Sequence, residues 1–144
     1  MRLTLPQPCR DLDHTADVGV EVTGASAEET LARLVLAQST LLTGGELVAP
    51  GPDARVAVAS QGGLAALSVE LLRELLFRFA TGRVLPGACE VVRLDASAAE
   101  VVVALGPYDP VRHAEGLDLK AVTRHGARFD RVDGGWRAQV IFDI

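Results

Sequence analysis

Three aspartates and a histidine lie close together near the N-terminus, in the stretch Asp11-Leu12-Asp13-His14-Thr15-Ala16-Asp17-Val18-Gly19. Aspartates that precede a strand often serve as turn residues, because their carboxylates accept hydrogen bonds from nearby backbone N–H groups. That interpretation accounts for Asp11 and Asp13. Asp17 lies beside Gly19, where a strand approaches other parts of the chain closely, and it is the better candidate for binding a cation through its carboxylate.

A second group of carboxylate oxygens lies at the other end of the chain. Asp143 immediately precedes Ile144, whose main-chain carboxylate is a further oxygen donor. Together with Asp17 these groups form an anionic, all-oxygen ligand set, which suits Ca²⁺ or Mg²⁺ better than Zn²⁺. The alternative is that Asp143 is simply a solvated strand end. If the metal hypothesis is correct, the two ends of the chain must meet.

Other chemistry has little support in the sequence. The histidines His14, His113 and His125 form no HxxxH or HExxH pattern, so hydrogen-bonding or surface roles are favoured for them. The chain contains no GxSxG, P-loop or GxGxxG motif. Glu70 and Glu74 lie one helical turn apart, which is typical of a solvated pair, although either could face a site between a helix and a sheet.

Composition excludes several classes of protein. The formal net charge is −5 and there is no basic run, so strong autonomous binding to nucleic acid is not expected. No apolar run is long enough to cross a membrane, and the N-terminus does not resemble a signal peptide. Cys9 and Cys89 belong to no CxxC motif, which favours free thiols. We therefore expect a cytoplasmic protein.

The hydrophobic pattern predicts two helices and several strands. Ser26-Ala27-Glu28-Glu29 is a capping box that opens a helix ending at Gly44-Gly45, and 64–80 is a second, strongly amphipathic helix. Alternating apolar residues predict strands, namely 18–23, 55–60, 89–94, 100–105, 117–125 with its continuation 127–132, and 136–143. The order is strand, helix, strand, helix and then strands. It predicts a single α+β domain over 1–144, with two amphipathic helices covering mostly antiparallel sheet.

Glycine and proline positions predict where the elements end. Pro6 and Pro8 argue against regular pairing before Asp11. Gly82 is expected to cap the second helix, and Pro86-Gly87 is expected to turn the chain. Asp133-Gly134-Gly135 predicts a tight turn before the last strand.

Several of these segments resemble a known family, the archeases. The resemblance rests on Asp13-His14-Thr15-Ala16-Asp17-Val18-Gly19, on Lys120-Ala121-Val122-Thr123 followed by His125, and on the ending Val140-Ile141-Phe142-Asp143-Ile144. Residues 69–76 also resemble the second helix of that family, and Tyr108-Asp109 with His113 resembles the loop before its lysine strand. The segments occur in the same order and span essentially the whole chain.

The resemblance implies an accessory protein rather than an enzyme. Archeases assist the RtcB-type RNA ligase of tRNA splicing and RNA repair, promoting guanylylation of the ligase by GTP with a divalent metal and sustaining multiple turnover. The family also implies a metal site at Asp17, Asp143 and Ile144, with Ca²⁺ as the implied ion and Mg²⁺ or Mn²⁺ as the working alternatives. His14, Glu74, Lys120 and His125 are then supporting or partner-facing residues.

Two positions depart from the family pattern. Arg124 stands where the family usually has an aromatic residue, and Arg73 stands where it usually has asparagine. Both add positive charge near the expected partner-facing surface.

Two other functions remain open from the sequence. One is a metal-dependent phosphoesterase-like enzyme with His14 or His125 as general base, and the other is a chaperone-like partner of a tRNA-modification enzyme.

Overall fold

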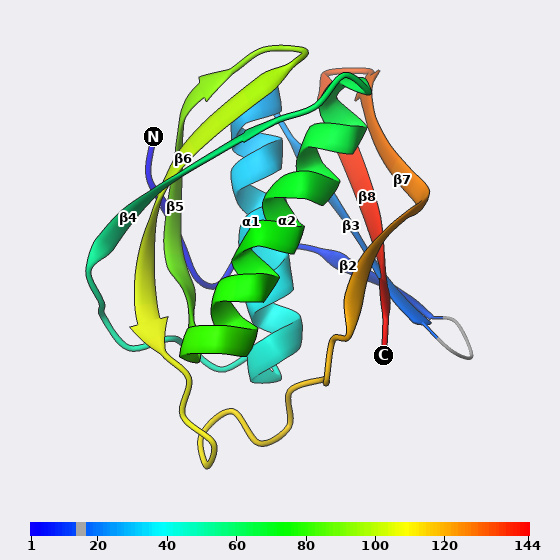
Figure 1. Ribbon diagram of the computed structural model, residues 1–144. Coiled ribbons are helices and arrows are strands. Elements are labelled where there is room, and N and C mark those ends of the chain that lie inside the picture. The colour runs from blue at the N-terminus through cyan, green and yellow to red at the C-terminus, as the bar shows by residue number, and fades with distance from the viewer. Residues whose placement is uncertain (14–16) are drawn as a thin grey trace.

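The computed structural model describes residues 1–13 and 17–144, and in these residues two helices lie between two antiparallel sheets (Figure 1). The first sheet has the strand order β1-β5-β6-β4 and the second has the order β2-β3-β8-β7. The predicted α+β fold is therefore confirmed. The sequence pattern did not indicate that the strands divide into two sheets.

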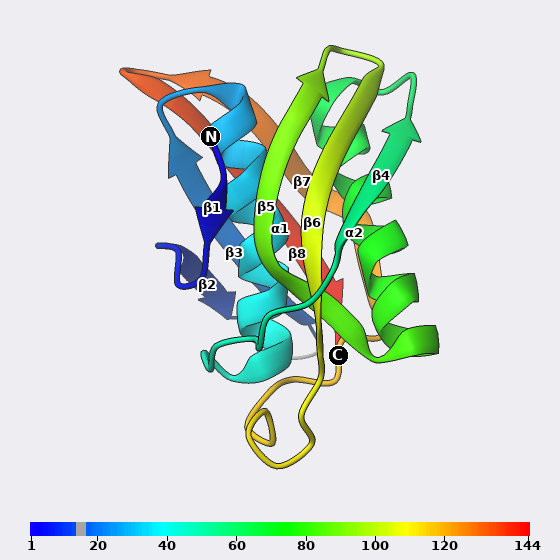
Figure 2. The same ribbon diagram turned by 90° about the vertical axis from the view of Figure 1, so that its left-hand side faces the viewer.

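The first sheet lies on the side of the molecule that faces the viewer in Figure 2. Its strands are β1 (Leu3–Thr4), β5 (Val84–Leu94), β6 (Ala98–Pro107) and β4 (Asp53–Ala59). The strands of the second sheet are β2 (Arg10–Asp13), β3 (Asp17–Gly24), β8 (Gly135–Asp143) and β7 (Ala121–Val132). The last strand, β8, is an inner strand of the second sheet, so the C-terminal end of the chain is held between β3 and β7.

Helix α1 (Ala27–Thr43) is buried on nearly every side. Ser26 caps it, since its hydroxyl accepts a hydrogen bond from the N–H of Glu29, as the capping box predicted. Gly44 ends it in the left-handed conformation, with φ of 70°. Because the helix packs against both β5 and β3, even Thr30, Gln38 and Ser39 are buried.

Helix α2 (Gly63–Gly82) packs mainly against β7 and buries one face, which includes Leu67, Leu71 and Leu75. The predicted cap at Gly82 is wrong by one residue. Arg83 adopts the left-handed conformation, with φ of 52°, and its N–H donates to the carbonyl of Phe79. The guanidinium of Arg83 lies over the Phe79 ring, 5.1 Å from its centroid, and this contact helps to offset the strain of a non-glycine residue there.

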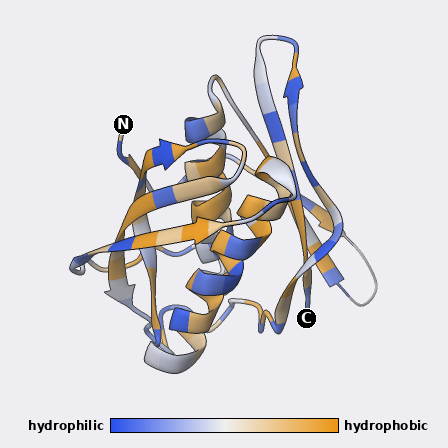
Figure 3. Cartoon of the chain, turned by 45° about the horizontal axis from the view of Figure 1, so that its top comes forward, coloured by the Kyte–Doolittle hydropathy of each residue, from blue (hydrophilic) through white to orange (hydrophobic). Residues whose placement is uncertain are grey.

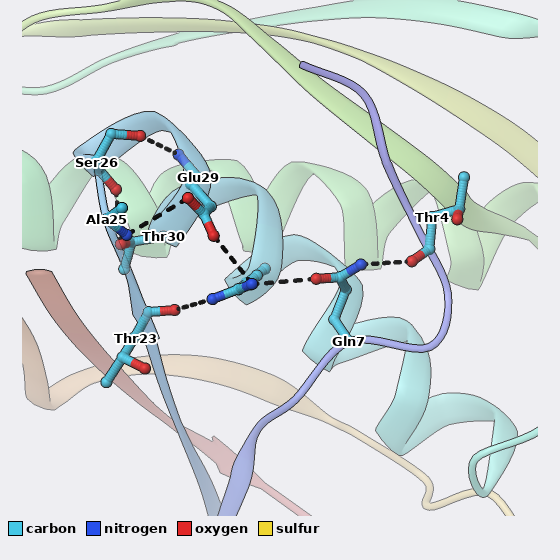
Figure 4. Close-up of polar contacts among 8 residues, drawn as sticks. Thr4, Gln7, Thr23, Ala25, Ser26, Glu29 and Thr30 are labelled. Carbon is cyan, nitrogen blue, oxygen red and sulfur yellow. Dashed lines mark hydrogen bonds and ion pairs between the residues drawn. The ribbon is translucent and has the colours of Figure 1, made fainter. Parts of the chain in front are cut away.

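A polar network joins the start of α1 to both sheets (Figure 4). Arg33 donates to the carbonyl of Thr23 at the end of β3 and to the side chain of Gln7, and it pairs with Glu29 at 2.9 Å. Gln7 in turn donates to the carbonyl of Thr4 in β1. The network therefore connects the ends of β1 and β3 through one arginine.

Other predicted segment boundaries are wrong as well. Residues 3–4 and residue 10 pair in strands, although no regular pairing was expected before Asp11. Residues 5–9, which include Pro6 and Pro8, belong to neither sheet. Pro86-Gly87 does not turn the chain, because β5 runs through it with an irregularity that accommodates the missing proline N–H. The strand predicted from residue 117 begins at Ala121, since the N–H of Leu117 donates instead to the carbonyl of Leu41.

The core lies between the sheets and around α1. Figure 3 shows apolar segments along both helices and along the strands that flank them. The buried side chains include Leu34, Leu72, Val101 and Phe142, each at 0 % exposure. Among the described residues, no helix is long and apolar enough to cross a membrane.

Candidate metal centre

Asp17 and Asp143 lie directly opposite each other in the antiparallel pair of β3 and β8. Side chains at opposed positions project from the same face of a sheet and lie close together. Their neighbours Val18 and Phe142 are buried against the helices, so alternation places both aspartates on the outer face of the sheet. The structure thus brings together two of the three predicted metal ligands.

The end of β8 positions the third. Ile144 follows Asp143 directly and is exposed, as is Asp143 itself. The main chain of Asp143 is held from both sides, because it pairs with Asp17 in β3 and with Ala121 in β7. The C-terminus lies at the free end of β8 (Figure 1). The main-chain carboxylate of Ile144 therefore directly follows a residue that is held in the sheet.

Gly19 explains why β3 can pack closely on both sides. A Cβ at this position would meet the Cβ of Leu12 at 3.1 Å and the Cδ1 of Ile141 at 3.3 Å. These neighbours come from β2 and β8, the two strands that flank β3. Glycine thus lets the side chains of both neighbouring strands close over β3, two residues after Asp17.

The donor set fits a hard divalent cation. Two carboxylates at opposed positions of a sheet repel each other unless a cation lies between them. A third carboxylate from the chain end would complete an all-oxygen set of the kind that Ca²⁺ and Mg²⁺ prefer. Asp17 is half-buried and its Oδ1 atom is buried. Within 1–13 and 17–144, no three side chains of His, Cys, Asp or Glu form a group that could hold a metal ion, and the hypothesis takes its third carboxylate from the main chain of Ile144.

The interpretation of Asp11 and Asp13 as turn residues is wrong. Both belong to β2, where Asp11 pairs with Val20 and Asp13 pairs with Val18. Pairing with β3 outweighs the weak preference of aspartate for turns. His14 lies outside the described residues.

Lys120 lies at the same end of the sheet as the two aspartates. Its N–H donates to the carbonyl of Asp143 at 2.8 Å, and its side chain is exposed. Lys120 therefore contacts the candidate site through its backbone.

His125 lies farther along β7. Between the pairs Thr123–Ile141 and Arg128–Gln139 the register shifts, so β7 carries extra residues there, and the exposed His125 is one of them. Gly126 permits this irregularity, with φ of 73° and the side chain of Ile141 packed against it. Ala121 is the residue of β7 that lies opposite Asp143, and His125 is four residues farther along the strand. His125 therefore does not lie beside the two aspartates.

Glu74 lies on the side of α2 that faces β4. It pairs with Arg78 at 3.4 Å and lines a shallow cavity of about 390 Å³ next to Ala57 and Val58 of β4. The structure does not bring Glu74 to Asp17 or Asp143.

Arg73 and Arg124, the two departures from the family pattern, share one partner. Both pair with Oε1 of Glu70, at 3.3 Å and 2.9 Å respectively. Arg73 also donates from Nε to the carbonyl of Val122 at 2.9 Å. Together the three charged residues connect α2 to β7. The spacing of Glu70 and Arg73 was a sequence signal for part of this network, but only the fold brings Arg124 to it.

His113 is buried at 1 % exposure and holds the connection between β6 and β7. Its Nδ1 accepts from the N–H of Asp109 at 3.0 Å, and its Nε2 is 2.9 Å from the carbonyl of Leu47, to which it donates. The N–H groups of Arg112 and Val111 donate to Asp109 and lower the pKa of its carboxyl. The predicted hydrogen-bonding role of His113 is confirmed.

Comparison with known proteins assigns the chain to a family. The model of the Archease protein family (MTH1598/TM1083) matches residues 10–144. Protein archease of Methanopyrus kandleri is 34 % identical over 95 % of this chain and 99 % of that protein. Protein archease of Methanosarcina mazei is 31 % identical over 92 % of this chain and 93 % of that protein.

Solved structures agree with this assignment. The solution structure of protein 1598 from Methanobacterium thermoautotrophicum superposes with a TM-score of 0.75 at 27 % identity, covering 94 % of this chain and 98 % of that one. The crystal structure of an archease from Thermotoga maritima, described as a possible chaperone, has a TM-score of 0.59 at 19 % identity over 97 % of this chain and 98 % of that one, and shares the fold. The chain therefore belongs to the archease family.

Proposed function

We propose that this chain is a cytoplasmic, single-domain accessory protein that activates an RtcB-type RNA ligase and is not an enzyme in its own right. Its task would be to promote the metal- and GTP-dependent guanylylation of the ligase, so that the ligase turns over repeatedly. Family membership supports this proposal. The observation that carries it is the opposition of Asp17 and Asp143 at the end of β8.

The three carboxylates of Asp17, Asp143 and Ile144 would hold one divalent cation, with Ca²⁺ as the first candidate and Mg²⁺ or Mn²⁺ as alternatives. A cation bound there supplies positive charge that can neutralise phosphate oxygens. The pairing of β3 with β8 holds the two aspartate residues at opposed positions before any partner binds. Lys120, exposed at the same end of the sheet, would add a further positive charge toward a phosphate.

The exposure of the site supports presentation to a partner. Asp143, Ile144 and Lys120 are all exposed, and the aspartates project from the outer face of the sheet. An enzyme that worked alone would need to exclude water from its reacting groups. A site exposed in this way is suited to completion by the active site of another protein.

The test is stimulation of a cognate ligase. Asp17→Ala and Asp143→Ala should abolish the stimulated guanylylation and the multiple turnover. Asp130→Ala, which removes an exposed carboxylate of β7 outside the candidate site, should not. The purified chain alone should hydrolyse no phosphoester. Normal stimulation by both site variants would refute the metal-centred mechanism, and chelator-sensitive hydrolysis by the chain alone would favour the enzyme alternative.

A second candidate is a chaperone-like partner of a tRNA-modification enzyme, favoured by the description of the Thermotoga maritima archease as a possible chaperone. Affinity capture with this chain from its own cells separates the two candidates. Recovery of the ligase supports activation. Recovery of a modification enzyme without the ligase supports the chaperone-like function.

A further inference from the structure

A groove of about 410 Å³ runs between α2 and the start of β7. One wall is formed by Arg73, Leu76, Phe77 and Ala80 of α2, and the other by residues 119–122. The groove is broad and open to solvent, and most of its lining is apolar. Its shape suits a side chain that protrudes from another protein better than an enclosed small molecule.

Phe77 is exposed at 62 %, although the residues that precede it in α2, Leu75 and Leu76, are exposed at only 1 % and 8 %. A large aromatic side chain in water beside an apolar groove leaves surface that a partner can bury. Aromatic residues of this kind contribute much of the binding energy in protein interfaces. Phe77 is therefore the natural anchor of a docking site.

The charged residues that line the groove, Arg73 and Lys120, are both cationic, in a chain with a net charge of −5. Arg73 is fixed, because it bonds to the carbonyl of Val122 and to Glu70. The Lys120 side chain is exposed and can adjust to a ligand. Charge complementarity thus favours an occupant that carries a carboxylate next to an apolar side chain.

The groove and the candidate metal centre lie at the same end of the second sheet. Ala121 lines the groove and pairs with Asp143, and the backbone of Lys120 bonds to Asp143. The aspartates and the groove are therefore neighbours along the ends of β8 and β7. A protein that binds the groove would therefore be held next to the carboxylates.

We propose that this groove, between Phe77 on α2 and residues 119–122, docks a segment of the partner ligase that presents a large apolar side chain beside an Asp or Glu. This inference rests on the proposed function for the identity of the partner. It assigns separate roles to the two sites. The groove determines affinity for the ligase, and the aspartate pair determines stimulation once the ligase is bound.

The test measures ligase guanylylation over a range of concentrations of this chain, together with calorimetric binding to the ligase. Phe77→Ser should raise the half-stimulating concentration about fivefold or more and leave the maximal stimulation intact. Val92→Ser is the matched control, since Val92 is also exposed, at 41 %, but lies on β5 away from the groove. It should change neither quantity.

Two variants of opposite charge at Ala80 test whether the occupant carries a carboxylate. Ala80 is exposed in the last turn of α2 and lines the groove. Ala80→Glu should weaken ligase binding, because it places a negative charge beside the occupant's carboxylate, whereas Ala80→Lys should preserve or strengthen binding. Thermal unfolding of each variant checks folding, and the Ala80 pair decides the question if Phe77→Ser does not fold.

The outcomes separate this inference from the proposed function. Equal ligase affinity of wild type and Phe77→Ser, or equal effects of the two Ala80 variants, would overturn the docking site. A change from dimer to monomer in Phe77→Ser would overturn it as well, since the occupant would then be a second copy of this chain. Groove-dependent binding without stimulation by the wild-type chain would refute the activator function and leave the docking site supported.

Discussion

The N–H of Lys120 donates a hydrogen bond to the carbonyl of Asp143 at 2.8 Å. This bond adds to the pairing of Asp143 with both Ala121 and Asp17, so the main chain that carries the candidate ligand is held independently of its side chain. Changes to the Asp143 carboxylate should therefore report on metal binding rather than on the fold.

Neutralising either aspartate should weaken cation binding. Asp17→Asn and Asp143→Asn each remove one of two like charges at opposed strand positions. For Asp143→Asn, the unfolding temperature without metal should be unchanged or slightly higher, because like charges at opposed positions repel each other. Affinity for Ca²⁺ should fall by an order of magnitude or more, because fewer anionic oxygens remain. Calorimetric titration with Ca²⁺ and Mg²⁺ measures this, with Asp130→Asn as the control that keeps wild-type affinity.

Extension of the chain beyond Ile144 should weaken the same site. Added residues convert the carboxylate of Ile144 into a peptide group and displace the terminal charge from Asp143. Two glycines appended to the C-terminus should lower Ca²⁺ affinity, and two glycines appended to the N-terminus should not. Equal affinities of the two extended chains would remove Ile144 from the ligand set and leave the aspartate pair in place.

Elements with a strong hydrophobic period were predictable from the sequence, and those defined by long-range pairing were not. The capping box at Ser26 and the apolar stripe of α2 are local signals, and both helices form where those signals place them. The pairing of Arg10–Asp13 with β3 is decided by a partner strand, so a segment rich in aspartate became a strand against its local preference.

The candidate site follows the same rule. Asp17 and Asp143 were identified by residue type and by their positions at strand ends, and the register of β3 with β8 brings them together. The groove beside Phe77 could not be predicted, because it forms only where α2 packs beside residues 119–122, although the spacing of the sequence places Phe77 outside the apolar stripe of α2. Likewise, the sharing of Glu70 by Arg73 and Arg124 depends on how α2 packs against β7.

Removal of the Glu70 carboxylate should loosen the attachment of α2 to β7. Glu70→Gln weakens its pairing with both Arg73 and Arg124 and should cost about 0.5–1 kcal/mol of unfolding free energy, since these pairs are partly exposed. Glu74→Gln affects the pairing with Arg78 alone and should cost less. Urea unfolding compares the two variants. An equal loss in both would show that the shared carboxylate adds nothing to the packing of α2.

Cys89 should make the chain less stable in alkali. Burial in β5 raises the pKa of its thiol from 9.0 to about 12. The folded chain then holds this proton more tightly than the unfolded chain does, so the contribution to stability is complete below pH 9 and declines as the pH rises toward 12. Urea unfolding at about pH 8 and about pH 10.5 should show a smaller decline for Cys89→Ala than for wild type. The thiol of Cys9 is half-buried, and burial raises its pKa as well. Cys9→Ala should therefore change the decline in unfolding free energy between the two pH values less than Cys89→Ala does.

His113 should determine how firmly the connection between β6 and β7 is held. Its ring accepts from the N–H of Asp109 and donates to the carbonyl of Leu47, both at a buried position, so His113→Leu leaves two backbone groups without these bonds. The expected cost is about 1–3 kcal/mol of unfolding free energy. The N–H of Arg112 bonds to Asp109 in the same turn, so trypsin should cleave after Arg112 faster in His113→Leu than in wild type.

Glu115→Ala, at an exposed position in the same connection, is the matched control for His113→Leu and should keep wild-type stability and cleavage. The connection leads directly to Leu119 and Lys120, which line the groove, so its loosening should also lower affinity for the ligase without removing any groove side chain. Metal binding should change little, because β8 holds Asp143 against β3 independently of this connection. Unaltered cleavage after Arg112 in His113→Leu, with an unfolding temperature equal to that of Glu115→Ala, would show that the buried imidazole does not hold the connection in place.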